Sequence, residues 1–180
     1  MPNTAVYGKI FKKNRAKSKK GFTADMKISS LCYIEKDNKY LMLHRISKKN
    51  DENAGKWIGI GGKFLDGESP EECVCREVLE ETGLTLTAFK YRGIVTFTSD
   101  KWESEYMHLF TADGFTGSLC DCDEGKLEWI DKKKLYELTL WEGDRIFLKL
   151  IEEDRPFFSL KLSYKGDKLV YAALDNKRIV

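Results

Sequence analysis

The sequence predicts one α/β domain with a mixed β-sheet and helices on both of its faces. Short segments with strand character occur along most of the chain, and a well-capped helix interrupts them near the middle. A second capped helix is expected towards the C-terminus. The length of 180 residues, with 42% hydrophobic and 33% charged residues, is typical of one globular domain that needs no disulfide support.

The first predicted elements form a β-hairpin. Residues 27–34 and 39–46 are rich in strand-forming residues, and residues 36–38, with the sequence Lys-Asp-Asn, form a turn signal between them. A polar loop is expected over residues 47–56. This hairpin is expected to enter the core of the sheet.

A glycine pair follows the next apolar run, residues 57–60. Gly61 and Gly62 have no side chain, so the backbone there can approach a ligand or a metal closely. Lys63, the next residue, is either a phosphate contact or an ordinary exposed lysine.

The central helix is predicted over residues 70–82. Ser69 is a good N-cap, Pro70 suits the first helical position, and Glu72 completes a capping box. Gly83 is the expected stop. One apolar arc of this helix is expected to pack on the sheet and consists of Val74, Cys75, Val78 and Leu79.

Three glutamates of the same helix share another face. Glu77, Glu80 and Glu81 have i, i+3, i+4 spacing. Carboxylates about 6 Å apart repel by roughly 3 kcal/mol at an effective dielectric constant of about 20. In a partly enclosed cleft they need cations, and oxygen ligands favour hard ions such as Mg²⁺ or Mn²⁺. A solvated acidic helix face is the alternative interpretation.

Further strands and two more helices are predicted after Gly83. The short helix is expected over residues 131–138, and a second capping box, Thr139 to Glu142, opens a helix that runs to about Glu153. Before these helices, strand patterns occupy residues 84–90, 93–98, 105–112 and 127–130, and after them residues 157–164 and 168–174.

Charge and cysteine content suggest a cytoplasmic protein with reduced thiols. The net charge is +2, but residues 9–20 carry seven basic residues and no acid, which indicates a basic N-terminal arm over residues 1–20. The domain itself is expected over residues 21–180. The five cysteines have no zinc-ligand spacing. No segment resembles a membrane span or a secretory signal, and no stable nucleic-acid partner is expected.

The stretch from Gly62 to Leu84 resembles the Nudix box, G-x5-E-x7-R-E-U-x-E-E-x-G-U, in which U is aliphatic. All nine fixed positions match: Gly62, Glu68, Arg76, Glu77, Val78, Glu80, Glu81, Gly83 and Leu84. The resemblance implies an α/β/α sandwich and hydrolysis of a nucleoside diphosphate derivative. It implies that the three helix glutamates bind metal and that one of them acts as the base. It also implies that Arg76 orients them and that Glu68 supports the site.

The family resemblance also implies two metal ligands outside the helix. A carbonyl just before the box often coordinates metal, and here it belongs to Gly61. An extra carboxylate often comes from a loop after the box, and Glu124 is the expected residue. Asp121, Asp123 and Glu128 are close enough in sequence to stay as alternatives, as does a solvated acidic turn.

The flanking sequence resembles the MutT-type 8-oxo-dGTP diphosphatase branch. By this resemblance Trp141 stacks on the base and Asp144 reads its hydrogen-bonding edge, while Arg45 holds the triphosphate. Ile58 and Gly143 depart from the branch pattern, so base recognition is expected to differ in detail. A core role for Trp141 and a solvated position for Arg45 remain the alternatives.

The sequence therefore predicts a Mg²⁺-dependent enzyme, with Mn²⁺ as a second candidate ion, that converts an oxidised purine nucleoside triphosphate to its monophosphate and pyrophosphate. Hydrolysis of another substrate, such as ADP-ribose or a dinucleoside polyphosphate, is the second hypothesis. A non-catalytic nucleotide-binding or RNA-binding module is the third. The oligomeric state stays open.

Overall fold

The computed structural model describes residues 26–46 and 51–180. The predicted basic arm, residues 1–20, lies outside these ranges, as does part of the 47–56 loop. The described elements are β1 (Lys27–Lys36), β2 (Lys39–Arg45), β3 (Trp57–Ile58), α1 (Pro70–Thr82), β4 (Leu84–Ser99), β5 (Glu105–Gly117), β6 (Gly125–Asp131), the 3₁₀ helix η1 (Lys132–Glu137), α2 (Glu142–Glu152), β7 (Phe158–Lys165), β8 (Lys168–Leu174) and β9 (Lys177–Arg178).

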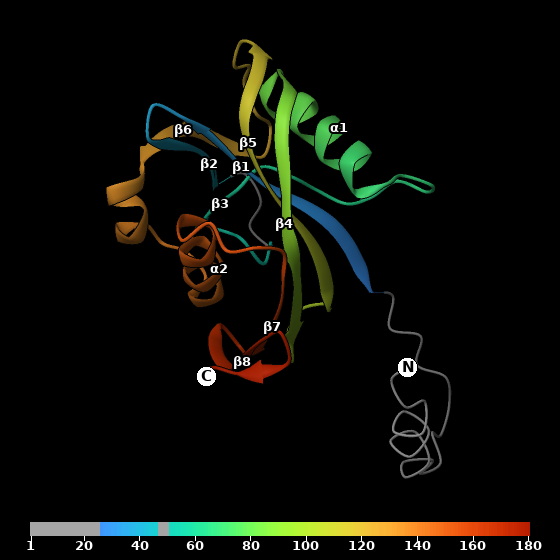
Figure 1. Cartoon of the computed structure of the whole chain (residues 1–180), viewed down its shortest axis with the longest axis vertical. Coiled ribbons are helices and arrows are strands. Elements are labelled where there is room, and N and C mark those ends of the chain that lie inside the picture. Colours follow the sequence, from blue (N-terminus) through green and yellow to red (C-terminus); the bar gives the residue numbers. More distant parts are fainter. Residues whose placement is uncertain (1–25, 47–50) are drawn as a thin grey trace, which may run out of the picture.

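The strands of the described chain form one mixed sheet (Figure 1). Their order is β3-β2-β1-β5-β4-β7-β8-β9, and β6 pairs with β2. The β1/β5 and β4/β7 pairs are parallel, whereas β1/β2, β4/β5 and β7/β8 are antiparallel. The predicted mixed sheet is confirmed.

Helices α1 and α2 pack on opposite faces of this sheet. Along β1, Tyr33 joins the core cluster that contains Phe147 of α2, and Cys32 and Ile34 join the cluster that contains Val78 of α1. Alternate residues of a strand point to opposite faces, so one strand supplies both cores. The predicted α/β/α sandwich is confirmed.

The first hairpin has the predicted turn. Asp37 and Asn38 have φ angles of 50° and 60°, a left-handed conformation that Asp and Asn tolerate better than most residues. The two strand patterns at residues 84–90 and 93–98, in contrast, belong to the single strand β4. Register shifts between Leu86 and Gly93 produce the irregularity that divides the sequence pattern.

Two details of the helices differ from the sequence predictions. The predicted Thr139 capping box does not form, because Trp141 is the N-cap of α2 and makes no side-chain capping bond. A tertiary contact replaces the missing capping bond, because the Tyr164 hydroxyl accepts a hydrogen bond from the N–H of Gly143 at 2.7 Å. Leu79 does not pack on the sheet with Val74 and is 50% exposed.

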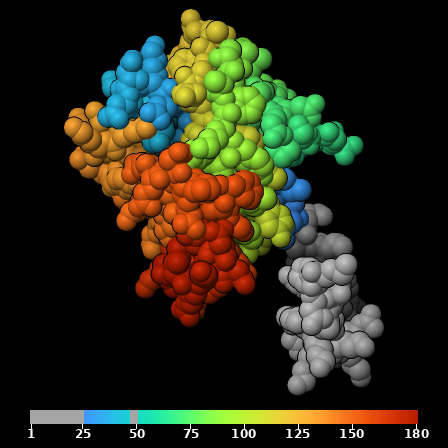
Figure 2. Space-filling view, viewed as in Figure 1, coloured from blue at the N-terminus to red at the C-terminus, as the bar shows by residue number. Residues whose placement is uncertain are grey.

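The space-filling view (Figure 2) shows where α1 and the C-terminal strands lie on one face of the molecule. In Figure 2, the green helix α1 and the red C-terminal strands occupy different parts of the visible face. Within residues 26–46 and 51–180, no helix is long and apolar enough to cross a membrane.

Candidate active site

Helix α1 has the predicted ends, and they hold its side chains in place. The N–H of Glu72 donates to Ser69 Oγ at 3.2 Å, and the N–H of Ser69 donates to Glu72 Oε2 at 2.8 Å, so the capping box is complete. At the other end Gly83 has a φ of 74° and donates its N–H to the carbonyl of Leu79 at 2.9 Å. The helix therefore presents its polar face in a fixed direction.

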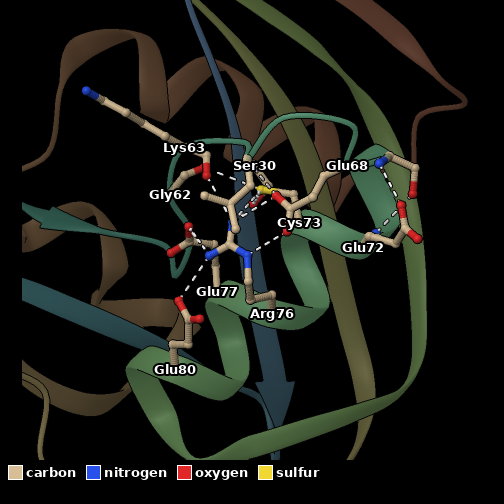
Figure 3. Close-up of polar contacts among 11 residues, drawn as sticks. Ser30, Gly62, Lys63, Glu68, Glu72, Cys73, Arg76, Glu77 and Glu80 are labelled. Atoms are coloured by element: carbon tan, nitrogen blue, oxygen red, sulfur yellow. Dashed lines mark hydrogen bonds and ion pairs between the residues drawn. The ribbon is translucent and has the colours of Figure 1, made fainter.

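Arg76 is the centre of a polar network on that face (Figure 3). Its Nε and Nη2 donate to the two carboxylate oxygens of Glu68 at 2.6 and 2.9 Å. Its Nη1 reaches Glu77 at 2.7 Å and Glu80 at 3.0 Å, and Nη2 also donates to the carbonyl of Lys63 at 3.0 Å. The predicted orienting role of Arg76 agrees with these contacts.

The bidentate contact has an electrostatic consequence for Glu68. The hydrogen bonds from Arg76, with a further one from the N–H of Leu65, lower the pKa of Glu68 to about 2. Glu68 is therefore ionised at neutral pH and tied to Arg76. This geometry suits a supporting residue.

Glu81 connects the helix to the glycine pair. Its Oε2 accepts the N–H of Gly61 at 3.2 Å. Burial, with a smaller contribution from the charge of Glu77, raises the pKa of Glu81 to about 7 against the opposing effects of the Gly61 N–H and Arg45. A buried carboxylate with this pKa is readily ionised when a cation arrives.

Gly62 leaves room for the carboxylate of Glu77 in the position that it occupies. A Cβ atom at Gly62 would lie 2.4 Å from Glu77 Oε2, closer than any normal contact. The absence of a side chain at this residue therefore gives the Glu77 carboxylate its space.

The three helix glutamates are not gathered at one point. Glu77 and Glu81 line a cleft together with Gly61 and Gly62, but the Glu80 side chain is 59% exposed and contacts Arg76 outside that lining. Among the described residues, no three His, Cys, Asp or Glu side chains form a cluster ready to hold a metal ion. Side-chain rotation would be needed for all three to bind one ion.

The cleft has a volume of about 550 Å³ and an excess of negative charge. Six carboxylates line it and only three cationic side chains do: Asp51, Glu52, Glu77, Glu81, Glu105 and Glu124 against Lys27, Arg45 and Lys63. A polyanion such as a nucleotide would be repelled by this lining unless cations accompanied it.

The predicted ligand Glu124 and the predicted phosphate contact Arg45 touch each other. Arg45 forms ion pairs with Glu124 and with Asp51, the latter also through Nε at 2.8 Å. Arg45 is thus not a solvated strand-end arginine. The Lys63 side chain is exposed and extends away from Arg76 (Figure 3), although Lys63 does line the cleft.

A second cavity of about 60 Å³ adjoins the cleft and contains both residues expected to read the base. Trp141 is only 7% exposed, and its Nε1 donates to Asn53 Oδ1 at 2.9 Å. The Lys56 ammonium lies 4.2 Å from the centre of its ring. Trp141 is therefore a core residue that also borders the cavity, rather than an open stacking surface.

Asp144 is a buried acid in the same cavity. Burial raises its pKa to about 7, against the opposing charges of Lys56 and Arg145. At neutral pH this carboxyl group exists in both protonation states, so it can accept or donate a hydrogen bond.

Sequence reasoning missed several residues that line the cavities, and four of them are polar or aromatic side chains near the proposed ligand. Glu52, Asn53, Trp102 and Glu105 lie in loops or at the start of a strand and belong to no recognised motif. The strand register would have revealed Glu105, because it places this residue beside Lys27 of β1. That register is a property of the folded sheet.

The donor set of the cleft is suited to hard divalent cations. Carboxylates from α1 and from the loop before β6 line it, and so does Gly61, the residue whose carbonyl is the expected ligand. Oxygen donors of this kind bind Mg²⁺ or Mn²⁺, which complete their coordination shells with water and phosphate oxygens. The cleft can therefore place a metal-bound polyphosphate beside ionisable carboxylates.

Comparisons with known proteins agree with this geometry. The family model described as NUDIX domain matches residues 27–151. A zebrafish (Danio rerio) protein named oxidized purine nucleoside triphosphate hydrolase is 34% identical over 130 residues, which cover 71% of this chain and 83% of the relative. The Nudix hydrolase YvcI of Bacillus subtilis is 35% identical over 118 residues, covering 63% of this chain and 71% of that protein.

A solved structure extends the similarity to the fold. The crystal structure of a MutT protein from Bacillus halodurans superposes with a TM-score of 0.74 and 26% sequence identity. The match covers 84% of this chain and 99% of that one.

Proposed function

This chain belongs to the Nudix hydrolase family as a MutT-type member that acts on phosphoanhydride bonds, and we propose that its substrate is an oxidised purine nucleoside triphosphate of the 8-oxo-dGTP type. The products are the nucleoside monophosphate and pyrophosphate, and Mg²⁺ is the proposed cofactor. The expected setting is the cytoplasm, where such an enzyme would remove damaged nucleotides before their incorporation into DNA.

The charge of the cleft carries the metal-dependent part of this proposal, and the relative named oxidized purine nucleoside triphosphate hydrolase supports the choice of substrate. Six carboxylates surround a space of about 550 Å³ that also contains Gly61 and Gly62. An enzyme for anionic substrates has such a lining when divalent cations take part in binding. Family membership supports the same reading, since Nudix hydrolases generally use divalent metal ions.

The proposed roles follow the positions of the side chains. Glu77, Glu81 and Glu124 would hold the metal with the Gly61 carbonyl, and Glu80 would join them by rotating away from Arg76. A metal held by these residues would neutralise phosphate charge and would lower the pKa of a water bound to it.

One of the helix carboxylates takes the proton of the attacking water. Arg76 positions Glu77 and Glu80, and its contact with Glu68 anchors it. Arg76 therefore acts through the glutamates, without touching the reacting atoms.

The second cavity is the proposed base site. Trp141 and Asp144 border it from the start of α2, and the cavity joins the cleft through shared residues. At about 60 Å³ it is small, so binding of a purine requires it to widen, and Asn53, which lines it and bonds to Trp141, is a residue that would move. Ile58, which departs from the branch pattern, also lines this cavity, and this favours a modified mode of base reading.

A substrate panel tests the proposal. Pyrophosphate release would be measured from 8-oxo-dGTP, dGTP, ADP-ribose and a dinucleoside polyphosphate, with Mg²⁺ and with a chelator. We expect 8-oxo-dGTP to have the highest kcat/KM and the chelator to abolish turnover. Equal turnover of dGTP, or preference for ADP-ribose, would contradict the substrate assignment.

Matched variants separate the chemistry from folding. Glu81→Gln and Glu77→Gln are expected to abolish Mg²⁺-dependent turnover, whereas Glu137→Gln, at an exposed carboxylate of η1, should retain it. Full activity in both cleft variants would remove these two glutamates from the mechanism and would favour a non-catalytic role for the box.

A further inference from the structure

Glu105 occupies the boundary between the cleft and the base cavity. It is the first residue of β5, where it lies in register with Lys27 of β1 and with Phe97 of β4. Residues of β5 with the same parity share its face of the sheet, and among them Met107 also lines both cavities. The Glu105 side chain therefore projects from a strand in the interior of the sheet, not from a mobile loop.

The two cavities share a wall. The residues common to both linings are Leu31, Glu52, Asn53, Ile58, Glu105 and Met107. If the phosphates of a nucleotide lie beside Glu81 and its base lies beside Asp144, the part of the nucleotide that joins them must lie along this wall. In a nucleotide, that part is the sugar.

The polar groups of this wall disfavour phosphate. Glu52 and Glu105 are both acidic, and burial raises the pKa of Glu105, with the charge of Glu52 adding to the shift. Lys27 offsets part of this charge, since its ammonium pairs with Glu52 at 3.3 Å. Uncharged groups that donate hydrogen bonds are the favourable neighbours for such carboxylates.

Glu105 retains capacity to accept hydrogen bonds. The Ser29 hydroxyl is its hydrogen-bonding neighbour and lowers its pKa, as do the charges of Lys27 and Lys63. An ionised carboxylate has about four acceptor positions. One hydroxyl neighbour leaves acceptor positions for a ligand.

A buried donor accompanies this acceptor in the cleft. Trp102 lines the cleft with Glu105, and its indole Nε1–H is buried with no acceptor in the described part of the chain. Buried polar groups in folded proteins nearly always have partners. Because this N–H has almost no accessible surface, a ligand hydroxyl beside Glu105 would reach it only after a shift of the Trp102 side chain.

We propose that Glu105 is a specificity-determining residue that accepts hydrogen bonds from the sugar hydroxyls of the nucleotide. The inference rests on the proposed nucleotide hydrolase function and adds a recognised group to it: the sugar. It identifies nucleotides with at least one free sugar hydroxyl as the substrate class, and a 2′-deoxynucleotide meets this condition through its 3′-hydroxyl.

The test compares nucleotides that differ only in the sugar. For one purine base, kcat/KM would be measured for the triphosphate with both hydroxyls, the 2′-deoxy form, the 3′-deoxy form and the 2′,3′-dideoxy form. We expect the native enzyme to lose about 10-fold or more in kcat/KM when both hydroxyls are absent, as for the loss of a hydrogen bond to a charged group. In Glu105→Met, kcat/KM for the substrate with both hydroxyls should exceed kcat/KM for the dideoxy substrate by no more than about two-fold. We call this quotient the hydroxyl ratio.

Control variants make the result specific. Glu103→Met removes a neighbouring carboxylate that also pairs with Lys27, at 3.6 Å, but is 64% exposed and lines neither cavity, so it should keep the native ratio. Glu105→Gln keeps the shape and one carbonyl acceptor, and its ratio should be intermediate. If Glu105→Met does not fold, Glu105→Gln decides: a ratio within two-fold of native would overturn the proposal.

The outcomes distinguish this proposal from the proposed function. Preference for oxidised over normal purine is measured at a fixed sugar, whereas the hydroxyl ratio is measured at a fixed base, with whichever purine is hydrolysed fastest. Indifference of the native enzyme to the dideoxy substrate would overturn the sugar assignment. A hydroxyl preference that persists unchanged in Glu105→Met would overturn the role of this residue.

Discussion

Arg76 and Glu68 form a two-point ion pair that joins the helix α1 to the loop before it. Guanidinium Nε and Nη2 donate to separate carboxylate oxygens at 2.6 and 2.9 Å, across eight positions of sequence. Such a fork-to-fork contact restrains both groups in orientation as well as distance. The remaining Nη1 of Arg76 then points to Glu77 and Glu80.

Replacing Arg76 should disable the site more than it destabilises the fold. In Arg76→Ala, Glu77 and Glu80 lose their orienting donor, and misplacement of such groups by about 1 Å can reduce kcat by about 100-fold. Arg76→Lys keeps the charge but not the fork, so most of the loss should persist. Steady-state kinetics and thermal melts would measure both effects.

Arg155→Ala is the matched control, because it removes an exposed ion pair with Asp175 at 2.9 Å, far along the chain. It should leave kcat unchanged. Native-like kcat in Arg76→Lys would show that charge alone suffices at this position.

Gly62→Ala should damage metal-dependent activity through Glu77. The new Cβ would come within 2.4 Å of Glu77 Oε2, so the carboxylate must move. We expect weaker apparent Mg²⁺ affinity and lower kcat, measured by titrating Mg²⁺ in the activity assay.

Gly67→Ala provides the contrast. Gly67 has a φ of 83° and open space around its Cβ position, so alanine there strains the backbone without touching Glu77. It should cost about 1 kcal/mol of stability and leave the Mg²⁺ dependence native. Equal Mg²⁺ affinity in both variants would show that Glu77 tolerates the displacement.

Asp144 should make the metal-free protein less stable as pH rises. Its pKa is about 7 in the folded protein, against an ordinary value of 3.8, so the folded state holds the proton more tightly than the unfolded state. Stability from this group is therefore intact below about pH 4 and falls between about pH 4 and 7, by on the order of 4 kcal/mol in all.

Asp144→Asn removes this titration. Urea unfolding at several pH values should show a shallower decline for the variant, with its advantage over the native protein greatest above pH 7. Parallel pH profiles for the two proteins would indicate that Asp144 ionises normally.

The Trp141–Asn53 hydrogen bond should stabilise the wall of the base cavity. Trp141→Phe and Asn53→Ala each remove the 2.9 Å contact from one side, and each should cost at least about 1 kcal/mol. Because both remove the same bond, the double variant should be less destabilised than the sum of the single variants by about 1 kcal/mol. Strict additivity in chemical denaturation would show that the bond contributes nothing.

Local features of this protein could be read from the sequence with high accuracy. The helix from Pro70 to Thr82, with its capping box and its Gly83 stop, has the predicted boundaries, because capping depends on residues close in the chain. The hairpin turn at Asp37 and Asn38 is local in the same sense.

Features that depend on distant contacts were not readable in this way. The N-terminus of α2 has a capping-box sequence, yet Tyr164 from β7 provides the hydrogen bond instead. The irregularities of β4 arise from its pairing with β5 and could not be distinguished from a break between two strands.

The sequence by itself determined the family and the reaction class, because the box residues have fixed spacing along one helix and the loop before it. Tertiary structure decided which groups meet. It placed Glu124 against Arg45, left Glu80 exposed beside Arg76, and brought Glu105 of β5 between the cleft and the cavity of Asp144. These relationships depend on strand register and on packing between segments far apart in the chain, and helical periodicity contains no information about either.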